Sequence, residues 1–164
     1  MADHHDPAAI EKRLWKDIED HRTGMLGLMR DDQHFQPMTA YVERDANQVW
    51  FFTYKDTDLA ETVGATGGHA MFVYQGKDLQ ACIGGHLTVR HDPERIERYW
   101  SPVVAAWYPE GKDDPRLTLL CLDCEDAQVW VTEAGPLRFA FEIARANATK
   151  TRPDLGDRAD LNLH

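Results

Sequence analysis

The sequence predicts a mainly β fold of the α+β class, an antiparallel β-barrel, closed or split, with helices at its sides. Six or seven short runs rich in β-branched and aromatic residues recur along the chain, and polar turns separate them. Helical spacing of apolar residues is confined to a few segments between or beside these runs. A barrel suits this pattern because closure removes exposed sheet edges.

The N-terminal segment 1–22 is expected to hold the first helix, over residues 8–21. Asp6 can cap this helix, and Pro7 suits its first turn. Its apolar positions recur every four residues, at Ile10, Leu14 and Ile18. One face of the helix should therefore lie on a core.

The remaining elements follow in order along a single domain that spans 1–164. Strands are predicted at 23–30, 35–43, 49–54, 69–75 and 79–89, and a final hairpin at 116–124 and 126–133. Further helices are predicted after the hinge that follows 49–54, at 92–100, in part of 101–115 and at 137–149. Gly84-Gly85 indicates a bulge or a close backbone approach. The polar tail 150–164 is expected to lie on the surface.

Composition excludes several classes of function. The chain has 164 residues and a net charge of −10, which disfavours nucleic acid and anionic membranes as partners. We found no secretory signal and no apolar run of the roughly 20 residues that a membrane span needs. Its three cysteines are too few for a disulfide framework. We therefore expect a cytoplasmic protein with reduced thiols.

The chemical motifs are weak. Cys121 and Cys124 form a CxxC pair, but residues three apart on a strand point to opposite faces, so a zinc site is not expected. The eight histidines are scattered, and no metal site is predicted. Ser101 is the only serine and lies in no nucleophile elbow, which excludes a serine triad.

The hinge "YKDTD" after strand 49–54 supports two interpretations. Asp56, Thr57 or Asp58 could cap the next helix, and Asp58 with Glu61 has capping-box spacing. Alternatively, Thr57 and the free N–H groups could hold a phosphate. A carboxylate about 4 Å from a phosphate is repelled by roughly 4 kcal/mol per charge pair at intermediate dielectric, and Lys55 offsets only part of that. The residues alone favour the cap.

Tryptophan is the clearest excess in the composition, with five residues. Trp100, Trp107 and Tyr108 lie in or beside a loop rich in Pro and Gly. Such a cluster suits either a ligand site or interface, or plain core packing.

Several segments together resemble the flavin-binding split-barrel superfamily of pyridoxamine 5'-phosphate oxidase, in its general stress protein branch. They are "GMLGL", "PMTAY", "VWFFT", "GGHLTVRHDPERIERYWSP", "WYPEGKDDPRLTLLCLDCEDAQVWV" and "LGDRADLNL", in family order from about residue 20 to the end. The resemblance implies a split barrel and a homodimer with two flavin sites at its interface. FMN is the expected cofactor, with FAD or no flavin as the alternatives.

The resemblance also implies which residues form the site. The flavin ring would lie against Gln36, Met38 and Thr39, and the ribityl chain and phosphate would approach Phe52, Thr53, Lys55 and Thr57. Gln80 would help to bind the flavin, and Trp107 of the aromatic cluster is added to the expected cofactor-binding residues. No residue can be identified from the sequence as a catalytic acid or base.

The chain departs from the family pattern at positions that usually carry cations. Gln36 stands where Arg often precedes the Pro-Met pair, and Thr57-Asp58-Leu59 replaces a Ser-Arg-Lys or Ser-Lys cluster. The C-terminal Arg/His motif of the true oxidase is missing, which argues against oxidation of pyridoxamine phosphate. Two hypotheses follow: an FMN-binding dimer with oxidoreductase chemistry on an unknown substrate, or a flavin-free split-barrel dimer that acts as a binding or stress-response scaffold.

Overall fold

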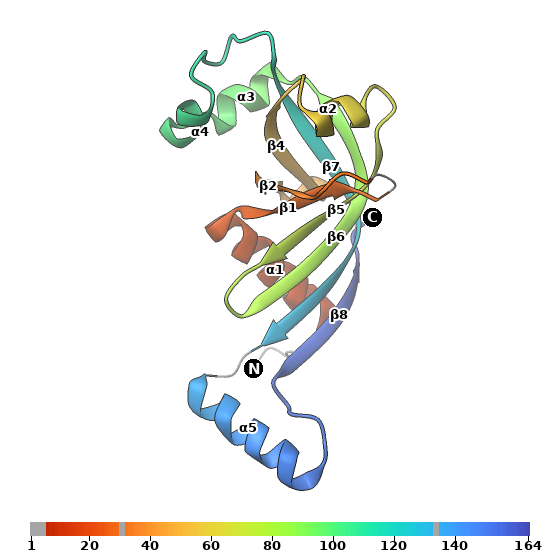
Figure 1. The fold of residues 1–164 in the computed structure, drawn as a ribbon, viewed down its shortest axis with the longest axis vertical. Coiled ribbons are helices and arrows are strands. Elements are labelled where there is room, and N and C mark those ends of the chain that lie inside the picture. Colours follow the sequence, from red (N-terminus) through yellow and green to blue (C-terminus); the bar gives the residue numbers. More distant parts are fainter. Residues whose placement is uncertain (1–5, 30–31, 133–134) are drawn as a thin grey trace.

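The computed structural model describes residues 6–29, 32–132 and 135–164, and its centre is one antiparallel sheet that curls into a half-barrel (Figure 1). The strand order is β2-β1-β5-β6-β7-β4-β3, and β8 also pairs with β7. The strands are β1 Thr23–Leu28, β2 Gln36–Thr39, β3 Tyr41–Glu43, β4 Gln48–Tyr54, β5 Gly68–Gln75, β6 Leu79–Arg90, β7 Leu117–Thr132 and β8 Gly156–Asn162. The predicted split barrel of the α+β class is confirmed.

Helices flank this sheet. They are α1 Pro7–His21, α2 Asp58–Val63, α3 Pro93–Tyr99, α4 Pro102–Trp107 and α5 Pro136–Thr149, with a 3-10 turn at Arg44–Ala46. The predicted cap of α1 is confirmed, because the Asp6 side chain accepts a hydrogen bond from the backbone N–H of Ala8. No helix in these described ranges is both long and apolar enough to cross a membrane.

β7 corrects one prediction, because the expected hairpin at 116–124 and 126–133 is a single strand. It pairs with β6 from Leu119 to Val131, and its other edge pairs first with β4 and then with β8. The register between β6 and β7 shifts between Gly84 and Gly85, which confirms the predicted bulge and leaves Glu125 as the extra residue. A side chain on Gly85 would collide with the carbonyl oxygen of Asp123, so only glycine fits there.

The bulge at Glu125 reverses which residues of β7 face the main core. Before it, Leu120, Leu122 and Cys124 point into that core, at even positions. After it, Ala127, Val129 and Val131 do so, at odd positions. One extra residue shifts a period of two by one step, so a single long strand can serve the same core on both sides of the bulge.

The C-terminal segment corrects a second prediction, because 150–164 is not only a surface tail. β8 pairs with β7 from Gly156 to Asn162, and Leu161 and Leu163 are buried in the main core. Alternate residues Arg158 and Asp160 remain exposed, which made the segment look uniformly polar in sequence.

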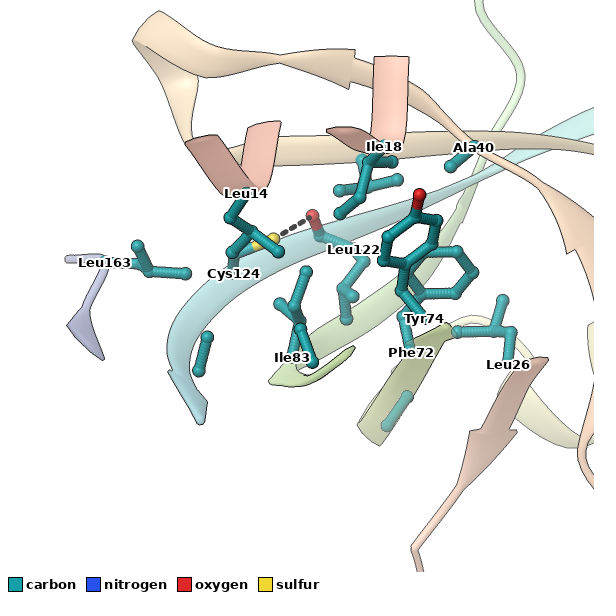
Figure 2. Close-up of a cluster of buried hydrophobic side chains, with 14 of the residues drawn as sticks. Leu14, Ile18, Leu26, Ala40, Phe72, Tyr74, Ile83, Leu122, Cys124 and Leu163 are labelled. Atoms are coloured by element: carbon teal, nitrogen blue, oxygen red, sulfur yellow. Dashed lines mark hydrogen bonds between the residues drawn. The ribbon is translucent and has the colours of Figure 1, made fainter. Parts of the chain in front are cut away.

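The main core lies between α1 and the concave face of the sheet (Figure 2). Leu14 and Ile18 of α1 are fully buried there, as their four-residue spacing predicts. They meet side chains from β1, β5, β6 and β7, among them Leu26, Phe72 and Ile83.

A second, smaller core lies on the opposite face of β4 and β7, under α3 and α4. Trp50 and Phe52 of β4 point into it, whereas Val49 and Phe51 point into the main core. Ile96 of α3 and Val104 of α4 close it. The strand pair β4–β7 is therefore covered on both sides, and this explains why its sequence is continuously apolar.

Candidate functional site

The hinge after β4 is a capped helix start in this chain. Thr57 is the N-cap of α2: its hydroxyl accepts a hydrogen bond from Ala60 N–H at 3.3 Å and donates one to the Tyr54 carbonyl at 3.0 Å. Asp58 is therefore the first helical residue, and the predicted Asp58–Glu61 capping box is wrong. Thr53 lies beside the cap, with 3.1 Å between the Thr53 and Thr57 hydroxyl oxygens.

Charges around the hinge are mixed. Lys55 is exposed and forms no ion pair within the described ranges. Arg116 packs over the Tyr54 ring at 4.6 Å and pairs with Asp114 at 3.0 Å. This hydrogen-bonded pairing lowers the pKa of Asp114 and raises the pKa of Arg116. With Asp56 and Asp58 also exposed, the hinge offers Lys55 as its uncommitted cation.

β2 divides the residues that were predicted to line a flavin ring. Met38 packs against the main core, and Gln36, two positions away, shares its side of the strand. Thr39 lies on the other side and is exposed. The three side chains cannot therefore face one ligand together, although the backbone of the exposed edge strand could contact it.

Thr39 borders a groove of about 600 Å³ between the end of α1, the β2–β3 edge and the α3–α4 segment. Its lining is mixed aromatic and charged: Glu19, Arg22, Thr39, Tyr41, Val42, Arg98, Tyr99, Trp100, Ser101 and Val103. Tyr41 stacks on Tyr99 with 4.8 Å between ring centroids, and Arg22 lies 5.1 Å from the Tyr41 ring. A flat aromatic molecule with polar edges suits such a lining.

The sequence did not single out Arg22, Tyr41 and Arg98 as site residues. They come from three segments that are separated by many residues, and only the folded sheet brings them together. Tyr41 could have been predicted as a site residue, because it ends the "PMTAY" segment and follows the residues that were predicted to line the flavin ring.

Glu43 anchors one wall of this groove. Its carboxylate accepts hydrogen bonds from Arg95, at 2.8 and 3.0 Å, and from the Tyr99 hydroxyl, at 2.6 Å. The Arg95 hydrogen bonds lower the pKa of Glu43, while burial, aided by Glu43, raises the pKa of Tyr99 to about 12. Arg95 also lies 4.2 Å from the Trp50 ring. Together these contacts fix α3 on β3 and β4.

The aromatic cluster of the α3–α4 segment is split between packing and exposure. Trp100 and Tyr108 pack against the second core, with Phe52 ring contacts at 6.0 Å for each. Trp107 of α4 is 76% exposed. Core packing is therefore confirmed for Trp100 and Tyr108, and a role of Trp107 in a ligand site or interface stays a prediction.

Gln80 lies far from the hinge in the same chain. It lies at the start of β6 and pairs with Trp130. At the other end of β6, Arg90 pairs with Leu119, and Leu119 also pairs with Phe52, which lies just before the hinge. Ten residues of strand correspond to about 33 Å. One chain thus presents the hinge and Gln80 at opposite ends of its sheet.

The CxxC pair behaves as predicted. Cys121 points into the second core and Cys124 into the main core, so the two thiols lie on opposite faces of β7. Burial raises the pKa of Cys121 to about 12 and raises that of Cys124 further, so both are neutral thiols. Within the residues that can be placed, no three His, Cys, Asp or Glu side chains are arranged to hold a metal ion.

Comparison with known proteins places this geometry in a family. Residues 9–154 match the family described as pyridoxamine 5'-phosphate oxidase like. The chain is 24% identical over 125 residues to general stress protein 26 of Bacillus subtilis, covering 73% of this chain and 87% of that protein.

Two solved structures share both fold and sequence. A candidate general stress protein 26 from Jannaschia sp. CCS1 is 35% identical with a TM-score of 0.80, covering 94% of this chain and 99% of that one. The general stress FMN/FAD binding protein of Xanthomonas citri is 42% identical with a TM-score of 0.72, covering 78% and 92%. The chain therefore belongs to the pyridoxamine 5'-phosphate oxidase-like family, in the branch of the general stress proteins.

Proposed function

We propose that this protein binds FMN between two copies of itself and acts as a flavin-dependent oxidoreductase. Each site would take the hinge and the β2 edge from one copy and Gln80 from the other. The relative from Xanthomonas citri, described as FMN/FAD binding, supports a flavin as the ligand.

The observation that carries this proposal is the separation of Gln80 from the hinge. Both belong to the site that the family resemblance implies, yet they lie at opposite ends of β6. A flavin cannot reach both in one chain, because about 33 Å of strand separates them. In a dimer with two-fold symmetry, the end of one sheet can meet the opposite end of the other.

The outer face of the sheet supports an interface between copies. Met25 and Val73 pair across β1 and β5 and are each 39% exposed, and Trp130, opposite Gln80, is 40% exposed. Cys82 lies next to Val73 on the same face. Apolar side chains in adjacent strands form a patch, and such patches commonly mark protein contacts.

The residues of the hinge fit FMN in chemical type. Lys55 supplies a cation for a phosphate, and the Thr53 and Thr57 hydroxyls can exchange hydrogen bonds with a ribityl chain. A bound flavin would supply the electron chemistry, and the protein would bind and orient it. Tyr99 and Tyr108 are phenols whose pKa burial raises to about 12, so both stay neutral well above neutral pH. Tyr108 can shield a ring and donate a hydrogen bond, whereas Tyr99 can shield a ring but already donates its one hydroxyl proton to Glu43.

A second candidate is the flavin-free scaffold, and the hinge itself favours it. The Thr57 hydroxyl already caps α2, Arg116 is paired with Asp114, and Asp56 and Asp58 would repel a phosphate. In this case the dimer would persist without a cofactor, and its groove would serve a different partner.

Titration of the purified protein with FMN distinguishes the two candidates. We expect the fluorescence of FMN to be quenched when it binds to the protein, with one flavin bound per chain. FMN should also raise the melting temperature of the protein, because a ligand that binds the native state must stabilise it. Riboflavin, which lacks the phosphate, is the matched control and should bind more weakly. A protein that is colourless and gains no thermal stability from FMN would contradict flavin binding and favour the scaffold.

A further inference from the structure

α5 exposes an apolar stripe that its own chain does not cover. Leu137 is 89% exposed and Phe141 65%, and both lie on one side of the helix with the exposed Ala144 and Ala148. In Figure 1 the helix stands beyond the end of the sheet, away from the other helices. The side of α5 that is buried instead carries Glu142 and Ala146.

Hydrogen bonds hold this helix in place against the loop that follows it. The Glu142 carboxylate accepts bonds from Arg145, at 2.9 and 3.0 Å, and from the Asp154 backbone N–H at 3.0 Å. Arg145 in turn donates to the Arg152 carbonyl. α5 and residues 150–154 thus form one ordered arm, with the apolar stripe turned outward.

The arm is also electrostatically complementary to the rest of the molecule. Residues 135–155 contain four basic and two acidic side chains, so they carry a net charge of +2, while the remaining chain carries −12 out of the total of −10. Two such acidic bodies repel each other, and a cationic arm reduces that repulsion where they meet. Residues 92–116, around α4, contain four basic and six acidic side chains, a net charge of −2.

Position along the sheet indicates where a partner would meet the arm. α5 follows directly after the end of β7 that carries Trp130, opposite Gln80. α4 lies at the other end of the sheet, with Val103 70% and Trp107 76% exposed one turn apart on one face. A two-fold arrangement that places Gln80 of one copy at the hinge of the other runs the two sheets in opposite directions, so the α5 end of one copy lies at the α4 end of the other.

We propose that α5 of one copy packs its Leu137–Phe141 stripe against the Val103–Trp107 ridge of a second copy, and so walls the flavin site of that copy. This inference rests on the proposed shared site, because that site sets the relative direction of the two sheets. The two alanines at the end of the stripe permit close approach of the helices. Trp107, which the sequence placed in the cofactor set, would then be covered by the arm.

Disulfide trapping between two single variants tests the contact. Phe141→Cys and Val103→Cys are each made in a Cys82→Ser background, mixed, and oxidised with diamide; Cys121 and Cys124 are buried. We expect a covalent dimer in the mixture and not in either variant alone. Thr149→Cys, two turns farther along α5 and off the apolar stripe, is the matched control and should form at least tenfold less cross-linked product with Val103→Cys.

Sedimentation velocity supplies the second measurement. Phe141→Asp should shift the dimer to monomer, while Asn147→Asp, which adds the same charge on an exposed flank of α5, should not. A dimer that survives Phe141→Asp and yields no Phe141–Val103 cross-link would overturn the arm contact alone. A cross-linked dimer that gains no stability from FMN would uphold the arm and overturn the flavin proposal, and a monomer under all conditions would overturn both.

Discussion

The Tyr99 hydroxyl donates a hydrogen bond to Glu43 at 2.6 Å, and this bond joins α3 to the edge strand β3. The same carboxylate receives Arg95, and its side chain is only 18% exposed. We therefore regard Glu43 as the residue that fixes the α3–α4 wall of the groove.

Replacing Glu43 of β3 should lower the stability of the protein more than replacing an exposed acid of α3. Glu43→Gln removes one of the two carboxylates that pair with Arg95 and leaves Asp92 as the other, and hydrogen bonds to charged groups contribute about 2 kcal/mol. We expect a loss of that size in the free energy of unfolding, measured with urea at neutral pH. Glu94→Gln is the control: Glu94 also pairs with an arginine, Arg98, but its side chain is 85% exposed, so the change should stay within about 0.5 kcal/mol.

Glu43 also makes the stability of the folded protein depend on pH in the acid range. The Arg95 hydrogen bonds hold the pKa of Glu43 below its ordinary value of 4.5 in the folded state. The unfolded chain therefore binds more protons in this range, and the stabilisation is fully present above about pH 4.5 and is lost as the pH falls through the folded pKa. Urea midpoints between about pH 7 and 3 should fall less steeply for Glu43→Gln than for the wild type. Parallel curves would contradict this role.

The bulge at Glu125 predicts an asymmetry between substitution and deletion. Glu125→Gln changes an exposed side chain and should alter stability by less than about 0.5 kcal/mol. Deletion of Glu125 should turn Ala127, Val129 and Val131 away from the main core. Exposing Val129 and Val131 costs about 2 kcal/mol each, a large share of the net stability of a domain. We expect the deletion variant to be recovered unfolded or aggregated by size-exclusion chromatography and circular dichroism, and a folded deletion variant would refute the register argument.

The acidic hinge predicts a gain of cofactor affinity from one charge reversal. If the FMN phosphate lies at the hinge, Asp58→Lys removes a repulsion and adds an attraction, and the Kd for FMN should fall by about tenfold. Glu61→Lys makes the same charge change one turn farther along α2 and should have a smaller effect. Fluorescence titration measures both, and equal Kd values for Asp58→Lys and wild type would mean that the phosphate binds elsewhere.

Much of the fold followed from local patterns in the sequence. The four-residue spacing in α1, the Asp6 cap and the Gly84-Gly85 bulge were each predicted and confirmed. β7 was misread because the acidic turn-like residues around Glu125 form a bulge within one strand, and a bulge and a hairpin begin with similar residues. β8 was missed because an edge strand with one solvent face alternates polar and apolar residues in a short segment.

The candidate site was predicted less completely, for a physical reason. Thr53 and Thr57 do meet at the hinge, because they are close in sequence. Thr39 and Met38 turned out to face opposite sides of β2, and Gln80 lies at the far end of the sheet. Such relationships depend on how distant strands are ordered in the sheet, and a local sequence pattern does not carry that information.

Subunit complementation tests the proposed shared flavin site most directly. Lys55→Glu impairs the hinge and Gln80→Glu impairs the opposite end of β6, so each variant alone should bind FMN at least about tenfold more weakly than wild type. In a mixed dimer, one site combines the intact hinge of one chain with the intact Gln80 of the other. We predict that co-refolded mixtures regain wild-type affinity at one site per mixed dimer, and mixtures that bind FMN no better than the separate variants would contradict a site built from two chains.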